Sequence, residues 1–184
     1  MNKRSGAIFI SGNGSNLQIF LNRQSEFEKL LVLSSDTNAH GVTRAKEAGV
    51  EYHILPKKID WTELDEFLAN KEIDFIFLAG FMRIVPGDFV RKWLGKIFNL
   101  HPSLLPRFKG LAAIEQAIEA NADVGASIHH VTAEVDAGEV VLQELAVSKA
   151  ELKGLSVEQV TDQVHKVEHS LVEQWIDQLQ SKSF

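Results

Sequence analysis

A carboxamide and an imidazole stand two residues apart near the middle of this 184-residue chain, at Asn99 and His101. They close an apolar run over residues 97–100 that is typical of a buried strand. Alternate residues of a strand point to the same face, so the two side chains would lie side by side where the strand ends. An amide that polarises a carbonyl, beside an acid–base residue, suits acyl or formyl transfer. A solvated edge strand with a turn-capping histidine would leave the same local pattern, and that alternative stays open here.

A glycine-rich loop at residues 11–16 (SGNGSN) follows a predicted strand over 7–10 and precedes a predicted helix. Ligands of open α/β sheets bind beyond the carboxyl ends of strands, where a helix start offers N–H groups to an anion. Leu17 occupies the position of the third glycine of a dinucleotide fingerprint, and the loop lacks the lysine of a nucleotide P-loop. We expect a single phosphate at this loop. A tight turn capped by Ser15 or Asn16 is the alternative.

Two further loops carry candidate side chains. Residues 80–85 (GFMRIV) leave a predicted strand with one arginine among apolar residues, and they could line a cleft for a flat ring with a polar edge. A buried connection with a surface arginine is the alternative. Asp136 lies in a turn beside a glycine, where an aspartate usually accepts backbone hydrogen bonds. A carboxylate that faces His101 would instead favour the protonated imidazolium.

The histidines near the C-terminus offer a competing interpretation. His165 and His169 share one face of a predicted helix and, with Glu168, match the pattern of one group of zinc peptidases. Core-like valines and leucines surround that face and no third ligand is signalled, so we predict no metal site. The adjacent His129 and His130 alternate across a predicted strand, so at most one of them is expected to join a site.

Strands and helices alternate along the first 110 residues. The predicted strands cover residues 7–10, 30–33, 52–55, 75–79 and 97–100, and the predicted helices begin near 17 and cover 42–48, 60–70 and 86–93. Strands that are apolar throughout indicate parallel strands buried on both faces. A helix over 111–120, strands over 126–131 and 140–146 around a turn at 136–138, and a long helix over 157–179 follow. The fold class is α/β: a Rossmann-like open sheet, parallel in its N-terminal part and mixed or antiparallel in its C-terminal part.

Composition excludes several classes of function. The net charge is −6, so no general basic surface indicates a nucleic-acid partner. The chain has no cysteine, which excludes thiolate chemistry and disulfides and fits a cytoplasmic location. No apolar run reaches membrane-spanning length, so no membrane partner is expected. A hydrophobic content of 45% is most simply one domain over residues 1–184.

Three segments together resemble one family. Residues 10–18 (ISGNGSNLQ) and 78–84 (LAGFMRI) are similar to the N-terminal and folate-cleft segments of the phosphoribosylglycinamide formyltransferases. Residues 99–106 (NLHPSLLP) resemble the signature of the wider 10-formyltetrahydrofolate-dependent formyltransferases. The resemblance runs in order from about residue 7 to residue 175. It implies the formyltransferase fold in a single domain.

The resemblance also implies an enzyme. Such an enzyme transfers the formyl group of 10-formyltetrahydrofolate, its co-substrate, to the amine of glycinamide ribonucleotide in purine synthesis, without a metal. Asn99, His101 and Asp136 would be catalytic, and Glu168 would contact the glycinamide amine. Gly14, Ser15 and Asn16 would hold the ribonucleotide phosphate. The folate site would comprise Met82, Arg83, Ile84, Val85, Asn99, Thr132, Ala133, Glu134, Val135 and Asp136. The only expected partners are these small molecules, and the chain would be a monomer or homodimer.

Related activities remain as alternatives. A formyltetrahydrofolate hydrolase or an amino-sugar formyltransferase would share the central signature, and a non-catalytic phosphate- or folate-binding module would not need His101. The extra tRNA-binding domain of methionyl-tRNA formyltransferases and the N-terminal regulatory domain of the hydrolases are not expected here. The sequence departs from the family at residues 112–113, which are alanines in place of polar residues, and at Glu139, which replaces a proline. No basic residue is obvious near position 62, where Lys57 and Lys58 are candidate substitutes.

Overall fold

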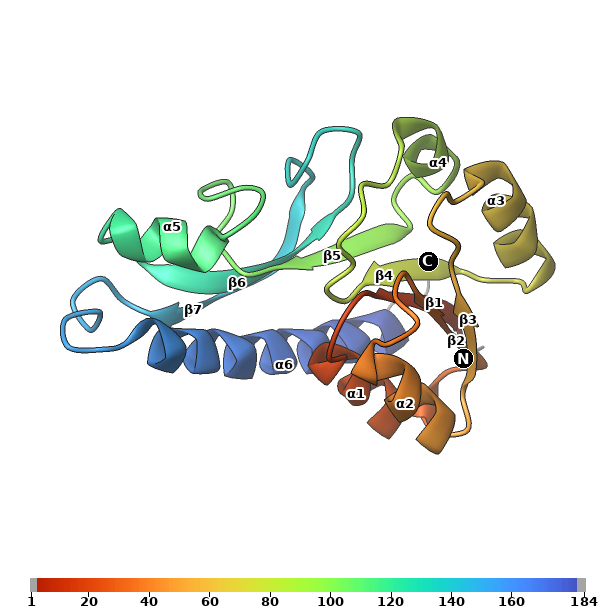
Figure 1. The fold of residues 1–184 in the computed structure, drawn as a ribbon, viewed down its shortest axis with the longest axis horizontal. Coiled ribbons are helices and arrows are strands. Elements are labelled where there is room, and N and C mark those ends of the chain that lie inside the picture. The colour runs from red at the N-terminus through yellow and green to blue at the C-terminus, as the bar shows by residue number, and fades with distance from the viewer. Residues whose placement is uncertain (1–2, 182–184) are drawn as a thin grey trace.

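A seven-stranded sheet lies at the centre of the computed structural model, which describes residues 3–181 (Figure 1). In chain order the elements are β1 (Ser5–Ile10), α1 (Ser15–Asn22), the 3₁₀ helix η1 (Gln24–Glu26), β2 (Lys29–Ser34), α2 (His40–Glu47), β3 (Glu51–Ile54), α3 (Trp61–Asn70), β4 (Phe75–Leu78), α4 (Gly87–Lys92), β5 (Ile97–His101), α5 (Ala113–Glu119), β6 (Val124–His130), β7 (Val140–Val147) and α6 (Val157–Ser181). The strand order is β3-β2-β1-β4-β5-β6-β7.

The direction of the strands changes between β5 and β6. The strands β1 to β5 pair in parallel, whereas β6 pairs antiparallel with both β5 and β7. The predicted α/β sheet, parallel at first and antiparallel at its C-terminal side, is therefore confirmed. The predicted domain of residues 1–184 includes residues 1–2 and 182–184, which lie outside the described residues.

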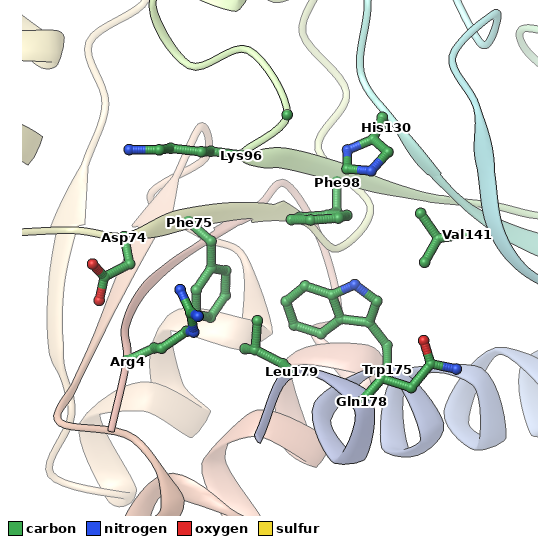
Figure 2. Close-up of a pocket in the computed structure, with 11 residues that line it drawn as sticks. Arg4, Asp74, Phe75, Lys96, Phe98, His130, Val141, Trp175, Gln178 and Leu179 are labelled. Carbon is green, nitrogen blue, oxygen red and sulfur yellow. The ribbon is translucent and has the colours of Figure 1, made fainter. Parts of the chain in front are cut away.

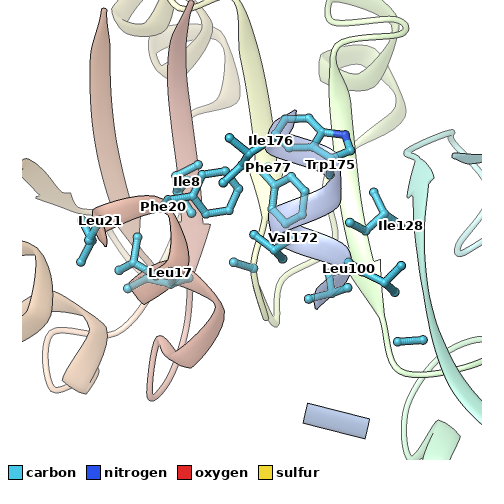
Figure 3. Packing of buried hydrophobic residues seen from close by; sticks show 14 of the residues in the cluster. Ile8, Leu17, Phe20, Leu21, Phe77, Leu100, Ile128, Val172, Trp175 and Ile176 are labelled. Atoms are coloured by element: carbon cyan, nitrogen blue, oxygen red, sulfur yellow. The ribbon is translucent and has the colours of Figure 1, made fainter. Parts of the chain in front are cut away.

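Each face of the sheet carries its own hydrophobic cluster. Ile8 of β1 packs in the cluster that includes α1 and α6, whereas its neighbour Phe9 packs in the cluster that includes α3 and α4. Alternate side chains of one strand thus enter both clusters, which explains why the parallel strands are apolar throughout. Trp175 of α6 lies in the first cluster, where its ring centroid is 4.9 Å from that of Phe77 (Figure 3).

Two details differ from the prediction. The strand β3 was expected to be buried, but it lies at the edge of the sheet, where Tyr52 is 37% and Ile54 38% exposed. Edge strands have a neighbour on one side only, and strand order cannot be read from local apolarity. The helix predicted over 111–120 begins at Ala113, because Ala112 has a left-handed φ of 55° that a helix cannot contain. Among the helices of residues 3–181, none is long and apolar enough to span a membrane.

The register between β5 and β6 determines which side chains share a face. Asn99 pairs with His129, and the preceding Phe98 pairs with His130. Because side chains alternate along a strand, Asn99 and His129 point to one face, while Phe98 and His130 point to the face that carries α6. Two adjacent residues on each strand therefore serve opposite sides of the sheet.

Candidate active site

A cleft of about 680 Å³ lies where the loops after β1, β4 and β5 meet the loop between β6 and β7. All the side chains predicted for the site line this one cleft: Gly14, Ser15, Asn16, Met82, Arg83, Ile84, Val85, Asn99, His101, Thr132, Ala133, Glu134, Val135, Asp136 and Glu168. His129, His165 and residues 110–113 also line it, although the sequence did not single them out for this role. The fold thus brings together segments that lie more than 150 residues apart.

The Asp136 carboxylate is the centre of the polar contacts in the cleft. Its Oδ2 accepts a hydrogen bond of 2.9 Å from the Gly110 N–H and lies 3.5 Å from Nδ1 of His101. Its Oδ1 accepts a hydrogen bond of 3.3 Å from the Asn99 amide and lies 3.4 Å from Nε2 of His129. Burial by itself would raise the pKa of Asp136, but His129, the Gly110 N–H and His101 hold that pKa below its usual value.

His101 is 5% exposed and fixed at both ring nitrogens. Its Nε2 lies 2.9 Å from the carbonyl oxygen of Phe108, so this nitrogen carries a proton and donates it. Its Nδ1 faces the Asp136 carboxylate. Two acceptors therefore face the two ring nitrogens, which is the arrangement that an imidazolium satisfies with both of its N–H groups.

The sequence could not decide whether His129 or His130 joins the site, and in the structure His129 lines the cleft. It is 1% exposed, and its Nδ1 donates to the carbonyl of His130 at 2.8 Å. Its Nε2 lies 3.1 Å from the Asn99 amide nitrogen and accepts from it when the ring is neutral. The two amide hydrogens of Asn99 can thus be shared between His129 and Asp136, which fixes the orientation of this side chain. The cross-strand pair Asn99–His129 would have revealed this contact, but it requires the register of β5 and β6.

The glycine loop turns sharply into α1. Gly14 has a left-handed φ of 74°, and a Cβ at this position would lie 2.7 Å from the Cα of Gly41. Arg44 holds the loop from α2, because its Nε donates to the carbonyl of Asn13 at 3.0 Å. No side chain caps α1, so the alternative in which Ser15 or Asn16 acts as the helix cap is wrong. The start of α1 instead presents uncapped N–H groups to the cleft, as an anion site requires.

Glu168 reaches the same region of the cleft from α6. Glu168 is 7% exposed, and its carboxylate accepts a hydrogen bond of 3.1 Å from the amide of Asn16. Burial raises the pKa of Glu168, and the hydrogen bond from Asn16 only partly opposes that effect. His165 lines the cleft as well, whereas His169 does not. Among residues 3–181, no group of three or more His, Cys, Asp or Glu side chains could hold a metal ion.

Apolar side chains form another part of the cleft wall. Met82 and Ile84 are 69% and 82% exposed, and Val135 faces the cleft from the β6–β7 loop. The Arg83 guanidinium donates to the carbonyls of Pro56, Lys57 and Ser35, so it holds three neighbouring loop positions in place. A flat apolar ring would find exposed side chains here, together with backbone groups that can pair with its polar edge.

The β6–β7 loop that carries Asp136 depends on a close backbone contact. A Cβ at Gly138 would lie 1.7 Å from the carbonyl oxygen of His130, so only glycine fits there. Asp136 itself has a positive φ of 48°. The turn therefore bends the chain back so that the Asp136 carboxylate reaches the ends of β5 and β6.

Comparisons with known proteins agree with this geometry. The sequence model of the family described as formyl transferase matches residues 4–176. The trifunctional purine biosynthetic protein adenosine-3 of Bos taurus is 40% identical over 176 residues, which are 90% of this chain. The chain spans only 17% of the length of that protein. The phosphoribosylglycinamide formyltransferase of Escherichia coli strain K12 is 36% identical over 175 residues, which are 89% of this chain and 81% of the relative.

A solved structure covers nearly all of the fold. The phosphoribosylglycinamide formyltransferase from Bacillus halodurans superposes with a TM-score of 0.87 and 36% identity, over 97% of this chain and 96% of that chain. The family resemblance inferred from the three motifs is thus confirmed over the whole described sheet, and this chain belongs to the formyl transferase family.

Proposed function

We propose that this chain transfers the formyl group of 10-formyltetrahydrofolate to the amine of glycinamide ribonucleotide in purine biosynthesis. One observation carries the proposal: a glycine loop with an uncapped helix start and a wall of exposed apolar side chains line one cleft together with Asn99, His101 and Asp136. Two different substrates can therefore meet at a single polar cluster. The names of relatives that match this chain over most of their length support the same reaction.

The ribonucleotide would bind at the end of the cleft formed by α1 and α6. Its phosphate would accept hydrogen bonds from the N–H groups of Gly14, Ser15 and Asn16. Its glycinamide amine would lie beside Glu168, whose buried carboxyl group is already oriented by Asn16. A carboxyl group whose pKa is raised by burial can accept a proton from the substrate ammonium near neutral pH, which leaves the amine free to attack.

The folate would bind at the apolar end of the cleft. Met82, Ile84 and Val135 offer exposed apolar surface to the pterin ring, and the backbone of residues 82–85 and 132–136 offers groups for its polar edge. The Arg83 side chain supports this wall through its bonds to neighbouring loops. The formyl group at N10 would then lie near the polar cluster at the end of β5.

The transfer forms one bond and breaks one. The amine nitrogen attacks the formyl carbon, negative charge develops on the formyl oxygen, and the bond from that carbon to N10 of the folate then breaks. Asn99 and protonated His101 would stabilise the oxygen. The amine loses one proton and N10 of the folate gains one, so the protons balance. To donate to the formyl oxygen, Nε2 of His101 must give up its hydrogen bond to the Phe108 carbonyl, while Nδ1 stays beside Asp136.

The alternatives differ in the acceptor. A hydrolase passes the formyl group to water, and an amino-sugar formyltransferase passes it to a sugar amine. The glycine loop with its uncapped helix start, together with the buried Glu168 beside it, favours an acceptor that has both a phosphate and an amine. Neither feature would be needed for water as the acceptor.

A formyl-transfer assay tests the proposal. The purified chain is incubated with 10-formyltetrahydrofolate and with glycinamide ribonucleotide, water alone or an amino sugar, and the formylated products are identified by mass spectrometry. We expect formylated glycinamide ribonucleotide as the main product. Equal or faster release of formate in water alone would refute the proposed acceptor.

A further inference from the structure

A second cavity lies on the opposite side of β5 and β6 from the active-site cleft. It has a volume of about 340 Å³ and is bounded by the start of β4, the start of β5, the end of β6 and the last turns of α6 (Figure 2). We call it the back pocket. Phe98 and His130 line it, while the adjacent Asn99 and His129 line the active-site cleft. The catalytic side chains and the back pocket are therefore separated by the thickness of one sheet.

Aromatic rings form the wall of the back pocket. The centroid of the Trp175 ring is 5.2 Å from that of Phe75 and 4.9 Å from that of Phe98. The ring centroids of His130 and Phe98 are 4.7 Å apart. Val141 faces this wall from β7 (Figure 2). A volume near 340 Å³ is within the usual range of small-molecule sites, and edge-to-face contacts with such rings favour a planar aromatic ligand.

Two nitrogens in this wall make no hydrogen bond with residues 3–181. One is the indole N–H of Trp175, which Figure 2 shows on the side of the ring that faces His130. The other is Nδ1 of His130, which is buried and donates or accepts according to the tautomer of the ring. Burial lowers the pKa of His130 against the opposing effect of Glu139, so the ring is uncharged at neutral pH.

The rim of the back pocket favours an anion. Lys96 is exposed at the rim and forms no ion pair within the described chain. The Asp74 carboxylate beside it accepts a hydrogen bond of 2.7 Å from the N–H of Ser5, which partly satisfies its charge. A carboxylate on the ligand would find a cation at the rim.

We propose that the back pocket is a binding site for a small planar aromatic carboxylate, distinct from both substrate ends of the active-site cleft. The ring lies against Phe98 and Trp175, with its carboxylate directed to Lys96. This inference rests on the aromatic wall, the two wall nitrogens without partners and the rim charge, and it does not depend on the proposed formyl transfer.

Binding of 2-naphthoate can be followed at the tryptophan indoles. The chain has three tryptophans, and Trp61 and Trp93 lie in the cluster on the other face of the sheet. In ¹H–¹⁵N spectra of the full chain, we expect the Trp175 indole peak to shift saturably with a Kd of about 1 mM or below, while the other two peaks stay in place. The neutral analogue 2-naphthalenemethanol should bind more weakly.

Two variants separate this site from nonspecific binding. Val141→Phe fills the back pocket and should abolish the Trp175 shift, and Lys96→Gln, at an exposed position, should weaken 2-naphthoate by about two- to fivefold while leaving the neutral alcohol unchanged. The proposal is overturned if Trp175 shows no saturable shift, or if the shift persists in Val141→Phe. Equal affinity for the carboxylate and the alcohol would overturn the assignment of an anionic ligand. If Val141→Phe does not fold, the Lys96→Gln comparison alone decides that point.

Discussion

His129 offers the sharpest test of how the active site is held together. The change His129→Leu keeps a buried side chain of similar size but removes the ring nitrogen that, in the neutral ring, can accept one hydrogen of the Asn99 amide, 3.1 Å away. An amide hydrogen left without a partner beside a position that is 1% exposed costs about 1–3 kcal/mol. If this cost falls on the orientation of Asn99 in the transition state, kcat falls by about 5- to 150-fold.

Two matched variants make the result specific. His129→Gln retains a side-chain oxygen that can accept from Asn99, so it should recover part of the lost rate. His130→Phe changes the next residue of the same strand, but that side chain faces the back pocket and contacts Phe98, 4.7 Å away between ring centroids. We therefore expect His130→Phe to leave kcat unchanged.

The assay is steady-state formyl transfer with both substrates varied. The reasoning predicts a fall in kcat for His129→Leu with a KM for the ribonucleotide within about threefold of the wild-type value, since neither the glycine loop nor Glu168 contacts His129. Thermal unfolding of all three variants serves as the control for folding. A kcat within about twofold of wild type in a folded His129→Leu protein would refute the role assigned to this residue.

Three further predictions follow from contacts in the cleft. His101→Ala and Asp136→Ala should each lower kcat by about 10²- to 10⁴-fold, while calorimetry still detects ribonucleotide binding; retention of most of the rate by His101→Ala would exclude the mechanism. Gly14→Ala places a Cβ 2.7 Å from the Cα of Gly41 at a φ of 74°, so it should destabilise the fold by about 1–3 kcal/mol and raise the KM for the ribonucleotide. Denaturant titration measures the first effect and steady-state kinetics the second. A wild-type KM would argue against the phosphate site. The raised pKa of Glu168 means that the folded chain binds its proton more tightly than the unfolded chain, so stability falls as pH rises from 4.5 through the folded pKa. Glu168→Gln should therefore raise Tm at pH values above the folded pKa but not below pH 4.5, and it should lower kcat/KM. A Tm difference between variant and wild type that does not change with pH would contradict this.

Local patterns were sufficient for most of the fold. The alternation of apolar strands and amphipathic helices is a property of neighbouring residues, and the long face of α6 repeats the same spacing along its length. The exposure of β3 could not be predicted in this way. It depends on which strand lies beside β2, and that is decided by the packing of segments far apart in the chain.

The site could be predicted in its residue types but not in its contacts. The i, i+2 spacing gave Asn99 and His101 a common face, which the structure retains. The sequence could not distinguish His129 from His130, because that choice needs the cross-strand register. The side chain of Arg83 likewise bonds to carbonyls 27 and 48 residues earlier in the chain, and no local signal indicates such partners. Backbone acceptors such as the carbonyl of Phe108 lie beyond any pattern of side chains.

The strands β5 and β6 separate the active-site cleft from the back pocket, and this restricts how the protein can change in length. A substitution at one position of these strands alters one side of the sheet only. Inserting or deleting a single residue within either strand reverses the direction of every side chain beyond it. A change in β5 would move Asn99 to the side of Phe98 and a change in β6 would move His129 to the side of His130, so in either case the polar cluster and the aromatic packing around Trp175 would be disrupted together. Length variation should therefore collect in connections such as residues 148–156, where it leaves both strands in frame.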